Sequence, residues 1–336
     1  MQSSTQGAKV LITARSFRDT PGAHKQLLAA AGCELVECPN QHPLGASELA
    51  QWIGGVDAAI LGLDVVNDAV LAAADRLRVI SRYGVGVDAV DVPAATRHGV
   101  IVTITPGANS VAVAELAIAL LMALARSIPY HDRVAKQGQW SRVGGMELTG
   151  ATLGVVGYGR IGREVAQRAH GLGMNVLAYD PLLGPEAFTG SPATPSDLDH
   201  LLAASDAVSL HLPLTPETHN LIDAAALARM KPTAYLINTA RGGLVDEEAL
   251  RVALAERQLA GAACDVFSKE PPEAGGLVAL DNFIAAPHIG SATRQTAARM
   301  SLQAAENALA VLRGERPPGV VNPEVYVSTH ALAERH

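Results

Sequence analysis

Aromatic residues are scarce in this chain, at 4% of 336 residues, whereas hydrophobic residues as a whole make up 49%. Alanine, valine and leucine supply most of this apolar content, and glycine is also abundant, with 31 residues. Such small side chains suit parallel strands covered by closely packed helices better than an antiparallel sandwich. The composition therefore favours an α/β fold, and the length favours two domains.

Long basic runs are also missing, and the net charge is −7 at pH 7. Nucleic acids and anionic lipid surfaces bind to basic patches, so neither is an expected partner. The first residues lack an apolar segment of signal-peptide length, and the most apolar stretch, residues 111–125, contains Glu115 and is too short to span a bilayer. We therefore expect a cytoplasmic protein without a membrane segment.

Cysteines are few as well. Cys33, Cys38 and Cys264 lack the spacing of a metal site, and their odd number does not suit a disulfide framework. Cys264 lies in an apolar, strand-like run, which is the usual place for a buried and unreactive thiol. We expect no metal and no disulfide.

Short apolar runs alternate with helical segments in the first third of the chain, which indicates stacked β–α units. The apolar runs are residues 10–13, 58–61, 79–81 and 100–104. A turn signal near Thr105 ends this pattern, and a second series of strands and helices covers residues 152–287. A final helix is predicted over residues 293–313, returning to the first domain.

These segments predict two doubly wound parallel sheets. The first is a discontinuous, flavodoxin-like substrate domain of residues 1–106 and 292–336. The second is an inserted Rossmann domain of residues 107–291, with cofactor and substrate expected in the cleft between the two. The helix predicted over 113–126 is apolar on nearly every side, so the body of the protein or a second subunit must cover it. We expect a homodimer through the region 109–126.

The clearest local signal is the segment TLGVVGYGRIGREVAQRAHGLGMNVLAYDP. An apolar strand enters Gly157-x-Gly159-x-x-Gly162, and a helix begins at once. The first glycine permits a tight turn, the second lets the backbone approach a pyrophosphate, and the third allows close packing of helix and strand. The bound anion lies at the positive end of the helix. The motif and its context predict a dinucleotide site.

Asp180 ends the following strand, close to the expected distance for an acid that binds the adenosine ribose. Its carboxylate accepts hydrogen bonds from the ribose hydroxyls and repels a 2′-phosphate, so NAD is favoured over NADP. A turn residue before Pro181 is the structural alternative. Arg160 is expected to meet the pyrophosphate.

Three reactive side chains each follow a later strand-like run: Arg241, Glu270 and His288. The carboxyl ends of parallel strands are where ligands bind in such sheets. Hydride transfer requires a group that exchanges a proton near neutral pH, and His288 suits that task. Glu270 is expected to fix and charge the imidazole, and Arg241 to hold a substrate carboxylate with its forked guanidinium.

Each of these side chains alone has a plain structural interpretation: a helix cap, a solvated acid or a surface turn. Their succession after neighbouring strands favours the catalytic interpretation. His211 also follows a strand and is set apart from the other histidines. The remaining ones are assigned to the surface: His24, His42, His98, His131, His170, His200, His219, His330 and His336.

These residues resemble the D-isomer-specific 2-hydroxyacid dehydrogenase family, in its phosphoglycerate dehydrogenase-like branch. The resemblance is carried by INTARGGLVDEEAL around Arg241, DVFSKEPP around Glu270 and PHIGSAT around His288. It extends to SRYGVGVDAVD, TPGANSVAVAEL and HLPLTPETHNLI, and so covers nearly the whole chain. It implies the family's fold and hydride transfer between NAD and C2 of a small D-2-hydroxy or 2-oxo acid.

The resemblance also implies further contacts. Backbone amides of Val85 and Gly86 would hold the substrate carboxylate, with Asn109 near the substrate; turn geometry is the alternative for the glycine. Asp265 would hold the nicotinamide carboxamide, or else cap the next segment. Pro213 would line the adenine pocket and Thr239 would lie near the nicotinamide ribose. The remaining predicted cofactor contacts are Ile161, Pro181, His211, Thr218 and Gly290.

The substrate is less well defined. Phosphoglycerate dehydrogenases commonly carry an Arg in the strand that reads AAILGLDVVN here, where Gly62 stands at about the matching place. One phosphate-binding cation is therefore missing. Arg82 has two interpretations, as a partner of an anionic substrate group or as part of a salt bridge within its domain. Two alternatives keep the fold: an NAD(H)-sensing, corepressor-like binding protein, and a dehydrogenase for an inorganic oxyanion such as phosphite.

Overall fold

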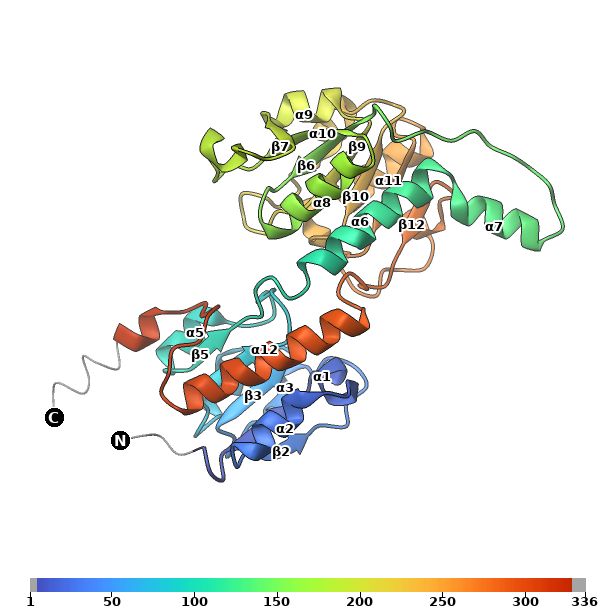
Figure 1. Ribbon diagram of the computed structural model, residues 1–336. Helices are drawn as coiled ribbons and strands as arrows, with labels where there is room; N and C mark the ends of the chain where they lie inside the picture. Colours follow the sequence, from blue (N-terminus) through green and yellow to red (C-terminus); the bar gives the residue numbers. More distant parts are fainter. Residues whose placement is uncertain (1–4, 328–336) are drawn as a thin grey trace. The chain divides into compact units, whose positions relative to one another are not determined.

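The computed structural model describes residues 5–327. The chain divides into two compact units, one from Met1–Asn109 with Ala292–His336, and one from Ser110–Ser291 (Figure 1). The sequence predicts these limits after residues 106 and 291. Each unit has its own sheet and its own core, and each is described separately.

The sheet of the first unit has five parallel strands in the order β2-β1-β3-β4-β5, which is the flavodoxin-like order. The strands are β1 (Lys9–Ile12), β2 (Glu34–Glu37), β3 (Ala58–Leu61), β4 (Val79–Arg82) and β5 (Ile101–Thr103). The helices are α1 (Arg15–Asp19), α2 (Ala23–Ala30), α3 (Ala46–Leu49), α4 (Asp68–Ala72), α5 (Val92–Arg97) and α12 (Arg294–Leu312).

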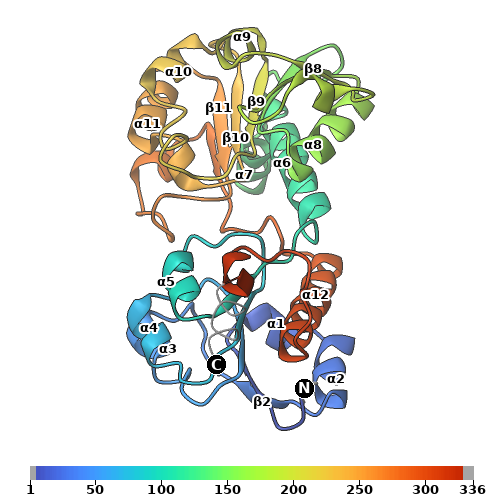
Figure 2. The same cartoon turned by 90° about the vertical axis from the view of Figure 1, so that its left-hand side faces the viewer.

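Helices cover both faces of this sheet, although no residue of its edge strand β2 is buried. Helices α3, α4 and α5 cover one face, and α1, α2 and α12 cover the other (Figure 2). Strands with two covered faces lose the alternation of polar and apolar residues, and all four residues of β3 are indeed buried. The late helix α12 completes this unit, as the sequence predicts.

The sheet of the second unit has seven parallel strands in the order β12-β11-β10-β9-β6-β7-β8. The strands are β6 (Thr152–Val156), β7 (Asn175–Tyr179), β8 (Ala193–Pro195), β9 (Ala207–Leu210), β10 (Tyr235–Asn238), β11 (Gly261–Cys264) and β12 (Phe283–Ala285). The order reverses between β6 and β9, as in a Rossmann fold, and ligands bind at such reversals. The two predicted doubly wound sheets are confirmed.

The helices of the second unit are α6 (Ser110–Ala125), α7 (Ile128–Lys136), α8 (Arg160–Gly171), α9 (Leu198–Ala204), α10 (Ala224–Arg229) and α11 (Glu247–Ala255). Three short 3₁₀ turns are η1 (Pro185–Phe188), η2 (Gly242–Leu244) and η3 (Gly276–Ala279). Helices α9, α10 and α11 pack on one face of the sheet, and α6 and α8 pack on the other.

Ten of the sixteen residues of the apolar helix α6 are buried, and six of these ten belong to the core cluster that it forms with α8 and the sheet of its own unit. The body of the protein therefore accounts for most of its hydrophobic surface, and Val111 and Met122 stay exposed. Between residues 5 and 327, no single helix is long and apolar enough to cross a membrane, and α6 and α7 pass that test only as a pair bent by 60°.

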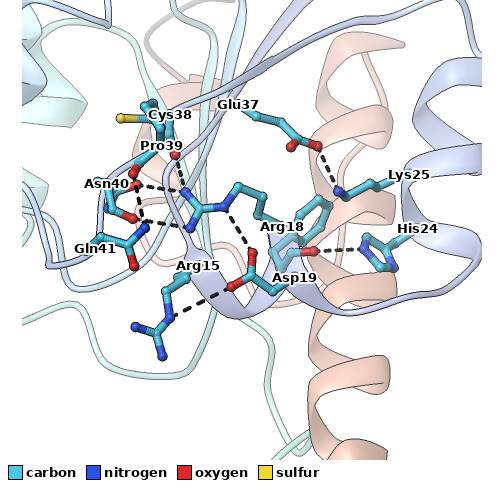
Figure 3. Close-up of polar contacts among 11 residues, drawn as sticks. Arg15, Arg18, Asp19, His24, Lys25, Glu37, Cys38, Pro39, Asn40 and Gln41 are labelled. Carbon is cyan, nitrogen blue, oxygen red and sulfur yellow. Dashed lines mark hydrogen bonds and ion pairs between the residues drawn. The ribbon is translucent and has the colours of Figure 1, made fainter.

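His24 corrects one sequence prediction, since it is 2% exposed and does not lie on the surface. Its ring packs edge-on against Phe17, and its Nε2 lies 3.0 Å from the Phe17 carbonyl (Figure 3). Burial is the largest cause that lowers the pKa of His24, so the ring favours its neutral form. The polar residues next to it in sequence suggested a surface position, but His24 lies on the buried side of α2, one turn before Leu28.

Candidate active site

The glycine motif forms the turn between β6 and α8. Gly157 has φ +98°, and a Cβ there would lie 2.6 Å from the backbone of His211 and Leu212. A Cβ on Gly162 would overlap the carbonyl oxygen of Gly157, so the helix can approach the strand only with glycine here. At Gly159 a Cβ would meet nothing within 4 Å. The first and third glycines thus serve packing, whereas the second leaves open space at the start of α8.

The predicted ribose acid follows β7, the strand next to β6. The two carboxylate oxygens of Asp180 accept hydrogen bonds from the amides of Tyr158 (2.8 Å) and Leu182 (3.0 Å). The acid is thereby tied to the glycine turn. Arg160 and Pro181 are exposed, and Ile161 is half-buried in the first turn of α8. The structure therefore brings the predicted phosphate and ribose contacts to one end of the sheet.

The loop after β9 carries His211, Pro213 and Thr218. Nε2 of His211 lies 2.9 Å from Oγ of Ser209, and Nδ1 is enclosed with no partner among the described residues. Burial lowers the pKa of His211 to about 3, so the ring is neutral. The Thr218 hydroxyl donates to the carbonyl of Pro213 at 2.7 Å, which fixes the loop.

Thr239 and Arg241 follow β10. The Thr239 hydroxyl is buried without a partner in residues 5–327. Open space at Gly159 and unpartnered polar atoms on His211 and Thr239 are what an enclosed polar ligand such as a dinucleotide would satisfy. We conclude that these residues fit the predicted cofactor.

Arg241 is followed directly by η2, where a Cβ on Gly242 would overlap the backbone of Phe267. The loop that carries Arg241 therefore packs tightly against the segment that leads to Glu270. The backbone of Arg241 is held as well, because its carbonyl accepts a hydrogen bond from the Asn238 side chain at 2.7 Å.

Glu270 and His288 form a direct pair, with 2.9 Å between Oε2 and Nδ1. The other carboxylate oxygen accepts a hydrogen bond from the amide of Phe267 at 3.1 Å, which orients the acid. With Nδ1 engaged, Nε2 is the imidazole nitrogen left for a ligand. Both side chains also line a cavity of about 310 Å³ with Phe267, Pro271, Pro272 and residues 285–287.

Electrostatics tune this pair for proton exchange. The hydrogen bond to Glu270 is the largest cause that raises the pKa of His288, against the opposing effects of burial and of the Arg241 charge. Burial acts to raise the pKa of Glu270, but the hydrogen bond and charge of His288, the amide of Phe267 and the charge of Arg241 together outweigh it, so this pKa is lowered. The Arg241 charge acts to lower the pKa of both groups.

Asp265 follows β11 and is 1% exposed. Its two carboxylate oxygens accept hydrogen bonds from the amides of Ile289 (2.7 Å) and Gly290 (2.8 Å). Burial raises its pKa, and those two bonds act against the rise. This acid thus contacts the segment that carries His288, a connection that the sequence alone does not indicate.

The predicted carboxylate-binding amides lie in the first unit, after β4. No described residue accepts a hydrogen bond from the amide of Val85 or Gly86. Arg82 is 4% exposed beneath this loop, and Nε donates to the carbonyl of Gly86 at 2.9 Å. Nη1 donates to the carbonyls of Leu61 (3.1 Å) and Gly62. Arg82 therefore braces the loop from within, a role that sequence reasoning missed.

Asn109 is the last residue of the first unit before α6. Its Oδ1 is buried without a partner among the described residues, which suits the predicted contact with a polar ligand. Between residues 5 and 327, no cluster of three or more His, Cys, Asp or Glu could hold a metal ion, and the three cysteines are free thiols.

Comparison with known proteins agrees with this geometry. Residues 118–290 match the model of the D-isomer specific 2-hydroxyacid dehydrogenase, NAD binding domain. A glyoxylate reductase of Thermofilum pendens is 46% identical over 84% of this chain and 86% of its own length. A D-3-phosphoglycerate dehydrogenase of Synechocystis is 43% identical over 83% of this chain, which spans only 51% of that longer protein. The crystal structure of a glyoxylate reductase from Paecilomyes thermophila has a TM-score of 0.84 at 30% identity, covering 95% of this chain and 99% of that one.

Proposed function

The chain belongs to the D-isomer specific 2-hydroxyacid dehydrogenase family and is an NAD-dependent oxidoreductase, and we propose that it reduces a short 2-oxo acid, with glyoxylate as the leading candidate. The observation that carries this proposal is the Glu270–His288 pair, whose geometry and charge suit proton exchange at a substrate oxygen. The similarity to glyoxylate reductases over most of both chains supports the choice of acid.

The reacting residues have distinct tasks in this proposal. Nε2 of His288 gives a proton to the 2-oxo oxygen during reduction and removes it from the hydroxyl during oxidation. Glu270 holds the imidazole by Nδ1 and stabilises its charged form. Arg241 forks onto the substrate carboxylate and draws electron density from the carbonyl. When bound, NADH supplies the hydride for C2.

The substrate carboxylate is assigned to the amides of Val85 and Gly86. Neither of these two successive amides has an acceptor among the described residues, so both could donate to an anion, and the buried charge of Arg82 next to them would favour its binding. Because Arg82 donates to backbone carbonyls, and Gly62 supplies no cation, the site suits a short acid better than a phosphorylated one.

The cofactor residues are proposed as follows. Gly159, Arg160 and Ile161 receive the pyrophosphate at the start of α8, and Gly157 and Gly162 shape the turn that binds it. Asp180, with Pro181, receives the adenosine ribose, and its carboxylate disfavours the 2′-phosphate of NADP. The remaining contacts are assigned to His211, Pro213, Thr218, Thr239 and Gly290, with Asn109 near the substrate.

A homodimer is also part of this proposal. Helix α7 and the loop after it extend away from the sheet of the second unit (Figure 1), and this arm exposes Trp140 (82%), Ile128 and Val143. Together with Val111 and Met122 on α6, these side chains give a discontinuous apolar surface that a second copy would cover. Light scattering should report twice the mass of 34.8 kDa, and a monomeric wild-type protein would contradict the dimer.

We place the enzyme in the cytoplasm, where thiols such as Cys33, Cys38 and Cys264 remain reduced.

A panel of 2-oxo acids with NADH and NADPH tests the activity, read at the nicotinamide absorbance. We expect turnover with glyoxylate, weaker turnover with larger acids, and a preference for NADH. Phosphite with NAD is included as an inorganic alternative. Absence of turnover with every acid, combined with tight NADH binding, would overturn the proposal and favour a sensor.

A further inference from the structure

Asp64 is a buried acid in the loop directly after β3 of the first unit. Its exposure is 1%, whereas its apolar neighbours Leu63 and Val65 are exposed at 47% and 43%. This arrangement reverses the usual partition, in which acids face water and apolar side chains are buried. The conformation of this loop therefore depends on the hydrogen bonds of the acid and not on the burial of apolar surface.

The carboxylate of Asp64 joins the loops that follow three strands. Oδ2 accepts from the Thr13 hydroxyl after β1 at 2.5 Å and from the Gly62 amide after β3 at 2.8 Å. Oδ1 accepts from the amide of Leu44, in the loop after β2, at 2.8 Å. All three loops lie at the carboxyl ends of parallel strands, which is the edge of such a sheet where ligands bind.

Gly62 is held by two buried charges of opposite sign. Its amide donates to Asp64, and its carbonyl accepts a hydrogen bond from Nη1 of Arg82. Nε of the same guanidinium donates to the carbonyl of Gly86 at 2.9 Å. Asp64 is therefore connected, through Gly62 and Arg82, to the loop after β4.

We propose that Asp64 is a positioning residue that fixes the amides of Val85 and Gly86 for the substrate carboxylate. It acts through Arg82, because the guanidinium holds Gly86 firmly only if Gly62 is itself held. An ionised carboxylate suits this task, since its hydrogen bonds are stronger than those of a neutral acceptor. The inference rests on the proposed assignment of the substrate carboxylate to these two amides.

Two variants weaken the acid to different extents. D64N removes the charge, and its NH₂ group cannot accept a hydrogen bond from an amide. We expect the KM for glyoxylate to rise about tenfold, with kcat within about threefold of wild type. The Kd for NADH should stay within about twofold, because residues of the second unit match the NAD-binding domain. T13V removes one donor and keeps the charge, so KM should rise only about threefold.

D57N is the matched control, because Asp57 is a second buried acid beside the same strand. Asp57 precedes β3, accepts from the amide of Lys9 at 2.8 Å and pairs with Arg76 at 2.8 Å. D57N should lower the Tm but leave the KM for glyoxylate within about twofold of wild type. Equal rises of KM in D64N and D57N, at a similar loss of Tm, would contradict a specific role for Asp64.

A double-mutant cycle with R82K tests the connection through Gly62. If Asp64 acts through Arg82, the two effects overlap, and the KM of D64N/R82K should stay within about threefold of that of the weaker-binding single variant. Independent effects would instead multiply to a rise of about a hundredfold, and this result would overturn the proposed connection.

Amide hydrogen exchange of residues 83–88, followed by mass spectrometry, reports on the loop without turnover. Exchange should be faster than in wild type in D64N and T13V, and unchanged in D57N. This readout separates the two proposals, since it stays valid if no 2-oxo acid is turned over. Wild-type exchange in both D64N and T13V would overturn the inference, and should D64N fail to fold, T13V carries the test.

Discussion

The two loops that carry the proposed carboxylate-binding amides and His288 are held by buried charges of opposite sign. In the first unit, Arg82 donates hydrogen bonds to backbone carbonyls, and no described residue accepts a hydrogen bond from the neighbouring amides of Val85 and Gly86. In the second unit, Asp265 accepts hydrogen bonds from two backbone amides of the loop that carries His288. In the function proposed above, the two loops have different tasks: the loop of the first unit binds an anion with its backbone amides, whereas the loop of the second unit provides a side chain for proton transfer.

This comparison predicts a separation of kinetic effects, and H288A should show the largest. Without the imidazole, we expect kcat for glyoxylate reduction to fall by about two to four orders of magnitude, with KM changed far less. Steady-state kinetics with NADH measure both. H170A, which removes an exposed histidine from the end of α8, is the matched control. Near-wild-type turnover in H288A would show that His288 is not the proton donor.

R82K is the corresponding test in the first unit. A lysine keeps the charge but cannot reach the carbonyls of Gly86, Leu61 and Gly62 with a planar fork. We expect KM for the acid to rise about tenfold, with kcat within about threefold of wild type. R78K is the control, because Arg78 also donates to backbone carbonyls, those of Val311 and Leu312, on the α12 side of the same unit. Equal effects of the two substitutions would contradict a specific brace.

The glycine motif sharpens the comparison within the second unit. Alanine at Gly162 would overlap the carbonyl of Gly157, so G162A should destabilise the unit by about 1–3 kcal/mol, as overpacking typically does. Alanine at Gly159 meets open space, so stability should be kept while the Kd for NADH rises about tenfold. Thermal unfolding and fluorescence titration measure the two effects. A destabilised G159A with normal NADH affinity would contradict the assigned roles.

His24 gives the smallest expected effect. Its pKa is lowered in the folded state, so the folded protein disfavours protonation, and stability present above the unfolded pKa near 6.5 is lost as the pH falls below it. H24Q should keep the polar contact with Phe17. When the pH falls from 7 to 5, the Tm of H24Q should decrease less than that of wild type, by on the order of a few degrees. Identical Tm profiles between pH 7 and 5 would show that His24 is not a source of acid sensitivity.

Much of the fold follows from patterns that the sequence displays. The glycine spacing and the apolar run before it predict the β6–α8 turn. A Cβ at Gly157 would clash with the backbone after β9, and a Cβ at Gly162 would clash with the carbonyl of Gly157. The strand β2 is harder to predict, since its sequence ELVE is half polar and none of its residues is buried. The three-residue strand β8 is too short for any periodicity to show. The arm after α7 has turn-forming glycines at positions 138, 144 and 145, but they do not indicate that Trp140 is exposed.

The candidate site is predictable where a side chain does the chemistry. Arg241, Glu270 and His288 could be proposed because each reactive group follows a strand, and the structure pairs the last two. The hydrogen bonds of Arg82 and Asp265 could not be deduced from the sequence. Their partners are backbone atoms, whose directions depend on the conformation of the folded loops. Sequence therefore indicates which groups react more readily than it indicates which groups hold them in place.

The pH dependence of kcat/KM for glyoxylate reduction, measured in wild type and in E270Q, tests the account most directly. Glu270 raises the pKa of His288, so the protonated imidazole should persist to higher pH in wild type than in E270Q. We expect the loss of activity on the alkaline side to move to lower pH in E270Q, while E273Q, which changes an exposed neighbouring acid, leaves the profile unchanged. Superimposable profiles for wild type and E270Q would contradict the claim that this pair carries the proton.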